Sequence, residues 1–318
     1  MKRITVFCFM FFIICSCLFA KDDLLYHYDF ENKTLFSFEG GMARLYCDES
    51  DLVYPGTYYL SKYKGDKIID IKKVKVNKTY QNFVAKTEND FIHYVKYACE
   101  NMLPSIQITR IGSIEDPMQY LTTNLNKTLY KYPILAVKSF SAKYQHINGT
   151  VVFNIYFDYY FDNKAQYDAY NSKMYLIIDN VLKSAIKSDD PEKYIYDYIL
   201  NRVNYESGTL SHTVQGALVD GKAVCDGYSK TLMMMLNMCG IQSDVMSGKT
   251  SSGVNHMWNR IYYKEFTNSD IVDHSEVESP YITYYCDITF EDTDNTKYKY
   301  YNLSYSPHKE IDFYGFYK

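Results

Sequence analysis

A cysteine at the start of an apolar segment is the residue of this chain that best suits covalent chemistry. Cys225 lies in GKAVCDGYS at 221–229, which runs into the apolar stretch 232–236 and stops at Gly240. This pattern predicts a helix of about four turns that begins at the cysteine and ends at a glycine cap. At that position the unpaired N–H groups and the helix dipole favour a thiolate. We also expect Gly227 to leave room for a substrate backbone.

A thiol nucleophile needs a base, and a histidine in a later strand-like segment could supply it. His256 lies in VNHMWNRIY at 254–262, where it shares one face of the predicted strand with Trp258. Asp287 lies in YITYYCDIT at 281–289, which also reads as a strand. Its carboxylate could accept a hydrogen bond from the imidazole and fix the tautomer. The sequence therefore contains a candidate nucleophile, base and orienter, in that order.

The three segments together resemble the bacterial transglutaminase-like family, a branch of the papain-like thiol enzymes. The motifs are G-x-x-V-C-x-G-Y-S around Cys225, H-x-W-N at His256 and D-x-T-x-x-D at Asp287. The resemblance covers roughly the C-terminal 130 residues and implies that Cys225 is the nucleophile, His256 the general base and Asp287 the orienter. The chain departs from the family at Tyr284, where tryptophan is frequent, and in a polar insertion at 264–280.

The resemblance also implies a reaction. The thiolate would attack an amide carbonyl of a protein or peptide, a cell-wall peptide included, and form an acyl-enzyme. Transfer to water makes the protein a peptidase or amidase, which is the first prediction. Transfer to an amine would make it a protein-crosslinking transamidase.

Two other classes of function stay open. The first is a non-catalytic binding or assembly module that keeps the fold, which a buried thiol far from the imidazole would indicate. The second is a tyrosine-rich N-terminal module that binds a surface glycan and delivers the enzyme, which an exposed row of aromatic residues on one sheet face would indicate.

Charge and ligand spacing favour no other kind of partner. The net charge is −4 with both signs interspersed, so we predict neither nucleic-acid binding nor attraction to anionic lipid. The three candidate catalytic residues are zinc-binding types, but no CxxC or HxxxH clamp accompanies them, and we predict no metal or cofactor. The acidic cluster 291–294 lacks a full calcium-loop pattern and indicates a solvated turn. His308, in a loop with a proline, is too isolated in sequence to rival His256.

The N-terminus indicates export. A basic start is followed by an uncharged run from 4 to 20, which is typical of a secretory signal peptide over 1–20. Cys17 lies in a loose lipoprotein box, so a lipid anchor there is an alternative and would be the expected link to a membrane. Either way the protein would work outside the cytoplasm, in the periplasm, at the cell surface or in the medium. In an exported chain Cys47 and Cys99 are a pair that could form a disulfide.

The remaining patterns predict an α+β chain of two domains after the signal, a smaller α+β module over 21–180 and a transglutaminase-like catalytic domain over 181–318. In the module, the patterns predict a helix capped by Asn89 or Asp90, a strand at 105–111, a helix at 117–130 and a hairpin of 134–144 with 151–161. This order predicts two helices on one sheet face. In the catalytic domain, Asp190 and Pro191 announce a helix ahead of the nucleophile. The resemblance implies a papain-like core there, with N-terminal helices packed on an antiparallel sheet.

Overall fold

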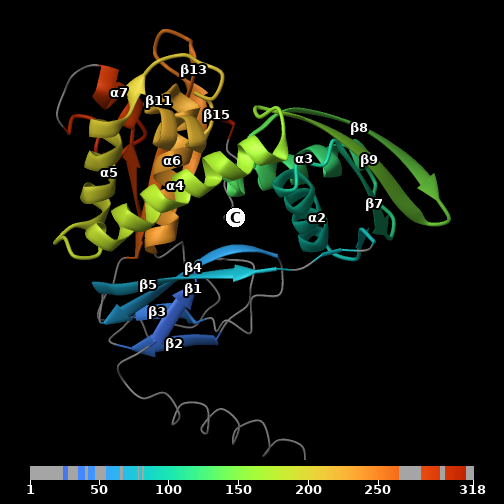
Figure 1. Ribbon diagram of the computed structural model, residues 1–318, viewed down its shortest axis with the longest axis horizontal. Coiled ribbons are helices and arrows are strands. Elements are labelled where there is room, and N and C mark those ends of the chain that lie inside the picture. Colours follow the sequence, from blue (N-terminus) through green and yellow to red (C-terminus); the bar gives the residue numbers. More distant parts are fainter. Residues whose placement is uncertain are drawn as a thin grey trace, which may run out of the picture.

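The computed structural model describes residues 24–27, 35–39, 42–46, 55–64, 67–77, 79–80, 82–264, 281–293 and 298–312. The predicted signal segment, Cys17, Cys47 and the insertion from 265 to 280 lie outside these ranges. The chain is α+β, as predicted, with one group of elements around α6, a second around α2 and α3, and an N-terminal sheet beside them (Figure 1). In the ranges described, no helix has the length and apolarity needed to span a membrane.

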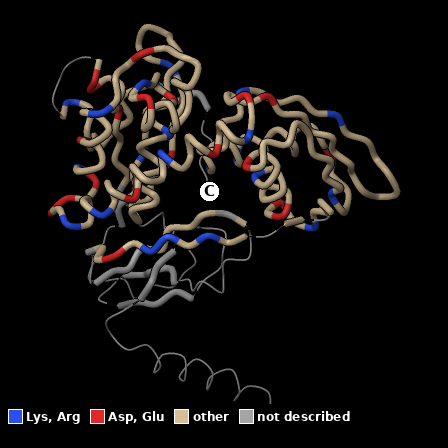
Figure 2. Tube along the Cα trace, viewed as in Figure 1, with Lys and Arg blue, Asp and Glu red and all other residues tan. Residues whose placement is uncertain are grey.

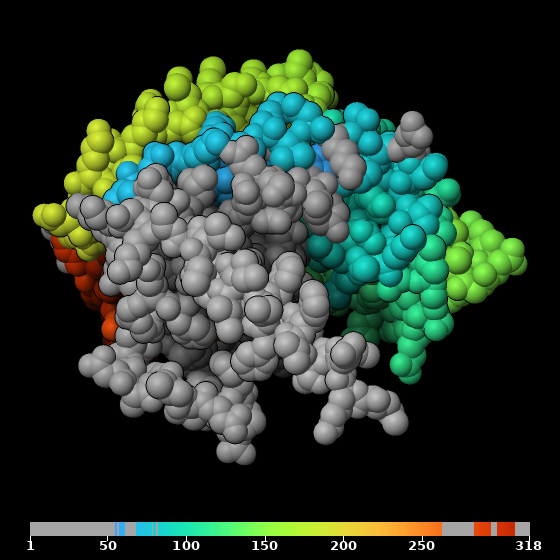
Figure 3. Space-filling view, turned by 90° about the horizontal axis from the view of Figure 1, so that it is seen from below, coloured from blue at the N-terminus to red at the C-terminus, as the bar shows by residue number. Residues whose placement is uncertain are grey.

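The N-terminal sheet contacts the core of the C-terminal region. Strands β1 (Leu24–His27), β4 (Gly56–Lys64) and β5 (Lys67–Val76) form an antiparallel sheet in the order β1-β4-β5, and β2 (Leu35–Glu39) pairs with β3 (Met42–Tyr46). Tyr59 of β4 is buried in that core, and its hydroxyl donates to Asp179 Oδ1 at 2.8 Å. Figure 3 shows the coloured residues of β4 and β5 lying along the helix that carries Asp179.

The module that follows has two helices on one face of a sheet, as predicted. Its elements are β6 (Val84–Ala85), α2 (Glu88–Glu100), β7 (Ser105–Ile111), α3 (Pro117–Lys131), the 3-10 turn η2 (Pro133–Leu135), β8 (Val137–Ile147) and β9 (Thr150–Tyr159), with strand order β6-β7-β9-β8. Buried residues of both helices pack against Phe153 and Ile155 of β9. The hairpin turns at Asn148 and Gly149, both with positive φ (47° and 74°), as the Asn-Gly pair predicts.

The start of α2 differs from the prediction. The cap is Thr87, because its side chain accepts from the Asp90 N–H at 3.1 Å while the Asp90 carboxylate accepts from the Thr87 N–H at 2.9 Å. This reciprocal capping box satisfies two donors that the helix itself cannot, so the helix begins earlier than an asparagine or aspartate cap at 89 or 90 would allow.

The C-terminal region surrounds α6 with helices on one side and a sheet on the other. Its elements are α4 (Lys164–Ala185), α5 (Pro191–Arg202), β10 (Asn204–Tyr205), the π-helical turn η3 (Gly216–Asp220), β11 (Lys222–Ala223), α6 (Cys225–Cys239), β12 (Ser243–Lys249), β13 (Asn255–Lys264), β14 (Tyr281–Cys286), α7 (Ile288–Thr293) and β15 (Lys309–Asp312). The sheet is antiparallel in the order β14-β13-β12-β15. Asp190 caps α5 and Gly240 ends α6 with φ 89°, both as the sequence predicts.

The helix α4 belongs in part to this core. Met174, Ile178 and Leu182 are buried there with residues of α5 and α6, while the first turns of α4 lie toward the module (Figure 1). The division of the chain at residues 180 and 181 stays a prediction. Acidic and basic residues are interspersed along the described chain (Figure 2).

Candidate active site

The cysteine lies where the sequence predicts it, as the first residue of α6. Just before α6, the strand β11 pairs in parallel with β10. The Val224 N–H donates to the Ser211 carbonyl at 3.1 Å. These contacts fix the turn that enters the helix. The prediction for Gly227 is wrong, because a β carbon there would lie 2.2 Å from the Ser211 oxygen. The glycine makes room for the chain's own backbone and not for a substrate.

Residues beside the cysteine and the histidine tie their two elements together. The Ser229 hydroxyl of α6 donates to the Met257 carbonyl of β13 at 2.9 Å, and the Asn259 side-chain amide returns a 2.9 Å hydrogen bond to the Ser229 carbonyl. Tyr228 donates to the Val203 carbonyl at 2.8 Å, which joins α6 to the end of α5. Because these groups are buried, their hydrogen bonds cannot be exchanged for water without cost. They fix the position of α6 relative to β13.

The fixed elements bring the three predicted residues together. The His256 Nε2 donates to Asp287 Oδ2 at 2.7 Å, and the Cys225 thiol lies in the surroundings of the same ring. Burial acts to lower the pKa of His256, but the hydrogen bond to Asp287 and the nearby Cys225 outweigh burial and raise that pKa to about 9. The imidazolium form is therefore favoured beside the thiol. Because Nε2 is used by Asp287, Nδ1 is the ring nitrogen left for the sulfur.

The cysteine and the histidine both line a cavity of about 320 Å³ that opens to solvent. Gly248, Lys249 and Asn255 also line it, from the ends of β12 and β13. Cys225 is partly exposed, whereas the other described cysteines, Cys99, Cys239 and Cys286, are buried free thiols. The predicted partner of Cys99, Cys47, lies outside the described residues. A reagent or substrate can therefore reach Cys225 more readily than these three thiols.

Asp287 lies at the end of a strand and not within one. The strand β14 ends at Cys286, and the Asp287 Oδ1 accepts from the Phe290 N–H at 3.1 Å, which caps the short helix α7. The predicted strand over 281–289 was thus too long, because this side-chain cap starts a helix at Ile288. The carboxylate is fully buried and its two oxygens are oriented by different partners.

A second histidine, which the sequence analysis set aside, completes the surroundings of this carboxylate. The His308 Nε2 donates to the same Asp287 Oδ2 at 2.6 Å, and its ring contacts Phe290 and Trp258 at centroid distances of 4.8 and 5.1 Å. Burial acts to raise the pKa of Asp287, but the hydrogen bonds from both histidines outweigh it and lower that pKa. The prediction that His308 is isolated is wrong, because only tertiary folding returns residues 298–308 to the site.

The acidic cluster after Asp287 is structural. Glu291 is buried and accepts from the N–H groups of Lys299 and Tyr300, and Asp292 Oδ2 lies 2.8 Å from the Tyr228 hydroxyl, which shares its one proton between this oxygen and the Val203 carbonyl. The predicted solvated turn at 291–294 is therefore wrong for its first two residues. Glu291 therefore holds the segment that leads to His308, and Asp292 holds the helix that begins at Cys225.

One set of side chains near the site has the composition of a metal site. Suitable ligand atoms of His256, Asp287 and His308 lie within 4.8 Å of one another. These are nitrogen and oxygen donors that zinc accepts. In this structure the same atoms hydrogen-bond to each other.

Comparison with known proteins relates one part of the chain to a superfamily. Residues 177–270 match the model of the transglutaminase-like superfamily, a range that holds Cys225 and His256 but not Asp287 or His308. No curated protein matches the chain. A solved structure described as "Crystal structure of a TGase" shares 15% identity over 81% of each chain, with a TM-score of 0.27. The chain contains a transglutaminase-like domain, as the motif resemblance predicted.

Proposed function

We propose that this protein is a cysteine-dependent enzyme that cleaves amide bonds of peptides or proteins by hydrolysis. The observation that carries the proposal is that the partly exposed Cys225 thiol and the His256 imidazole line one cavity, with the imidazole hydrogen-bonded to the buried Asp287 carboxylate. This is the arrangement that a nucleophile, base and orienter require. We retain export as part of the proposal, with a lipid anchor at Cys17 as its alternative.

The proposed reaction begins with the thiolate and imidazolium pair. The Cys225 sulfur attacks the amide carbonyl carbon, and the carbonyl π electrons move to oxygen to give a tetrahedral oxyanion. We expect the backbone N–H of Cys225, at the start of α6, to help stabilise that charge. His256 then donates its proton to the leaving amine as the C–N bond breaks, which leaves a thioester on Cys225 and a neutral imidazole.

Hydrolysis completes the cycle. His256, now neutral, takes a proton from a water molecule as its oxygen attacks the thioester, and the carboxylic acid leaves as the C–S bond breaks. The thiolate and the imidazolium are regenerated. Asp287 holds the His256 ring in the tautomer that presents Nδ1 to the sulfur, and we assign His308 the role of a positioning residue that holds the Asp287 carboxylate.

The first test is selective alkylation of the thiol. In the wild-type protein near neutral pH, iodoacetamide should label Cys225 faster than the buried Cys99, Cys239 and Cys286, because a thiolate displaces iodide and a buried thiol does not. Cys225→Ala should lose the fast phase in peptide mass spectrometry, and Cys239→Ala is the matched control that should keep it. Equal fast labelling in Cys225→Ala would refute the assignment of the nucleophile.

The second test separates hydrolysis from transfer. The enzyme is incubated with a peptide library with and without an added primary amine, and acyl-enzyme and products are read by mass spectrometry. Free acids in both samples support hydrolysis. Amide products in proportion to the amine would show that the protein is a transamidase, and an unmodified enzyme with unchanged peptides would favour a non-catalytic module.

The described residues do not favour the two alternatives to this proposal. The thiol of Cys225 is partly exposed and lines the same cavity as the imidazole, whereas a retained but inactive fold predicts a buried or distant thiol. In the hairpin of β8 and β9, the exposed residues Tyr144 and Tyr156 lie on opposite sheet faces, because Tyr144 pairs with the core residue Phe153 and Tyr156 alternates with it. They do not form a glycan-binding row.

A further inference from the structure

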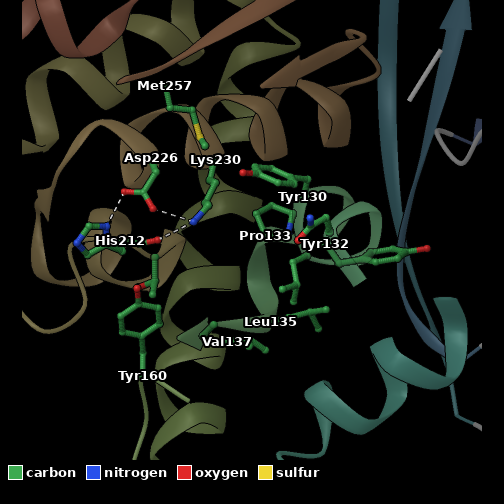
Figure 4. A pocket seen from close by; sticks show the side chains of 14 residues that line it. Tyr130, Tyr132, Pro133, Leu135, Val137, Tyr160, His212, Asp226, Lys230 and Met257 are labelled. Atoms are coloured by element: carbon green, nitrogen blue, oxygen red, sulfur yellow. Dashed lines mark hydrogen bonds and ion pairs between the residues drawn. The ribbon is translucent and has the colours of Figure 1, made fainter. Parts of the chain in front are cut away.

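A second cavity lies beside the candidate active site, between the module and the catalytic region. It has a volume of about 190 Å³ and shares two lining residues, Asp226 and Met257, with the cavity that holds Cys225 and His256. From the module it is lined by residues around the end of α3 and η2, and from the catalytic region by residues near the start of α6 (Figure 4). The two cavities are therefore neighbours that meet at Asp226 and Met257.

The two regions meet directly at the residue that separates the cavities. Tyr130 of the module and Cys225 both pack against the small apolar cluster that contains Met257. Pro133 and Leu135, which follow α3, add to the apolar wall of the cavity. In Figure 4, Tyr130 and Pro133 lie across the cavity from Asp226 and Lys230. The wall suits the methylene groups of an amino-acid side chain.

The polar wall of the cavity has a carboxylate, Asp226, whose oxygens already accept hydrogen bonds, and an ammonium group, Lys230, that can donate one more. Asp226 Oδ1 accepts from His212 Nδ1 at 2.8 Å and from the Gly227 N–H at 3.0 Å, and its Oδ2 accepts from Lys230 Nζ at 2.9 Å. Lys230 Nζ also donates to the His212 carbonyl at 3.1 Å. An ammonium group has three hydrogens, so one remains beyond these two bonds. Among the residues that line this cavity, Asp226 is the single carboxylate and Lys230 the single lysine or arginine.

The histidine in this network is held in place on two sides. Its Nδ1 is bonded to Asp226, and its ring stacks on Tyr160 with an interplanar angle of 16°. Burial first, and then the charge of Asp226, raises the pKa of Tyr160, so its hydroxyl stays neutral. The position of Lys230 is thus set by Asp226, and that of Asp226 by His212. The cation is pre-positioned, which reduces the entropy lost when a ligand binds.

We propose that this cavity is a substrate subsite for an acidic group, a carboxylate carried on a short apolar stem next to the amide that reacts at Cys225. The carboxylate accepts the remaining hydrogen of Lys230, and the stem packs against Pro133 and Leu135. The volume of about 190 Å³ is below the roughly 300–1,000 Å³ of small-molecule pockets, which fits one side chain better than a cofactor. The inference rests on the proposed function, since it describes the substrate of the same thiol.

Two groups of a substrate could supply this carboxylate, a glutamate or aspartate side chain and the terminal carboxylate of a peptide. Covalent probes of Cys225 can distinguish them. Peptide chloromethyl ketones place residues on the acyl side of the thiol, and N-iodoacetyl peptides place them on the leaving-group side. Each set is made with Glu or Gln at the two residues nearest the reactive carbon. The iodoacetyl set is also made with a free acid or an amide at its C-terminus.

The measured quantity is the ratio of labelling rates at Cys225 for each acid and its neutral partner. It is taken within one variant, so that a change in the reactivity of the thiol itself cancels. In the wild type we expect the acidic probe of one set to react about tenfold faster, as a hydrogen bond between charged groups allows. The ratio should fall to about one in Lys230→Met and be retained in Lys230→Arg. Lys127→Met, which removes a lysine of α3 outside the cavity, is the matched control and should keep the wild-type ratio.

Two results would overturn the subsite. One is a wild-type ratio near one for the Glu and Gln pairs of both sets and for the free acid and amide. The other is a tenfold ratio that Lys230→Met leaves unchanged. Either result would leave the enzyme proposal standing if plain iodoacetamide still labels Cys225 selectively. Failure of iodoacetamide to label Cys225 would remove both proposals.

Discussion

Glu192 provides a prediction whose size can be worked out from the structure. It lies in the first turn of α5 and is 3% exposed. Neither oxygen of its carboxylate has a hydrogen bond of good geometry to another described residue. Burial raises the pKa of Glu192 to about 7, against the weaker opposite effect of Tyr301 and Asn302 nearby. The Asn302 N–H donates to Cys286 Sγ at 3.3 Å, and Cys286 is the residue before Asp287.

The sign of the effect follows from proton linkage. Below its ordinary pKa of 4.5 the Glu192 carboxyl is protonated in the folded and the unfolded chain, so it has no effect on stability. As the pH rises to about 7 the unfolded chain releases this proton while the folded chain retains it, and the folded state loses stability. At ~1.4 kcal/mol for each pH unit, the loss is about 3 kcal/mol at pH 8.

The Glu192→Gln variant should remove this loss, because an amide of the same shape does not ionise. We expect it to be more stable than the wild type by about 2–3 kcal/mol at pH 8, after allowing ~0.5 kcal/mol for the lost acid in the first turn of a helix. Near pH 4 the two proteins should have nearly equal stability. The measurement is the free energy of urea unfolding from pH 4 to pH 8.

The control is Glu88→Gln, which also removes a glutamate from the first turn of a helix, but an exposed one paired with Lys127. Its stability should stay within about 0.5 kcal/mol of the wild type at every pH. A difference between wild type and Glu192→Gln that does not change with pH would refute the reasoning. Equal stability at pH 8 would do so as well.

The remaining predictions concern the site. His308→Phe removes one donor from the buried Asp287 carboxylate and should slow alkylation of Cys225 roughly tenfold, while His308→Gln, which retains an N–H donor, should restore most of the rate. Equal rates in both variants would show that the ring only fills space. Gly227→Ala should lower stability by about 1–3 kcal/mol in thermal unfolding, since its β carbon would meet the Ser211 carbonyl at 2.2 Å. Gly208→Ala, where no atom lies within 4 Å, is the control, and a loss as large there would contradict the packing argument.

Local signals in the sequence determined much of the fold. The Asn148-Gly149 pair specifies its hairpin because both residues tolerate positive φ, and Asp190 with Pro191 specifies the start of α5. The end of α6 at Gly240, with φ 89°, is fixed in the same way by a neighbour in the chain. Each of these features depends on residues a few positions apart, so it can be read before any tertiary contact is known.

Tertiary structure determined which residues are hydrogen-bonded to a buried charge and which line the same cavity. His308 reaches Asp287 only because Glu291 and the end of β14 hold the returning segment, and no local pattern encodes that contact. The cavity beside Cys225 combines Pro133 of the module with Lys230 of α6, which are brought together by packing of two regions. The surroundings that act on the pKa of Glu192 likewise include Tyr301 and Asn302, far along the chain. Periodicity and capping act over a few residues, whereas the partner of a buried polar group is whichever group the fold places beside it.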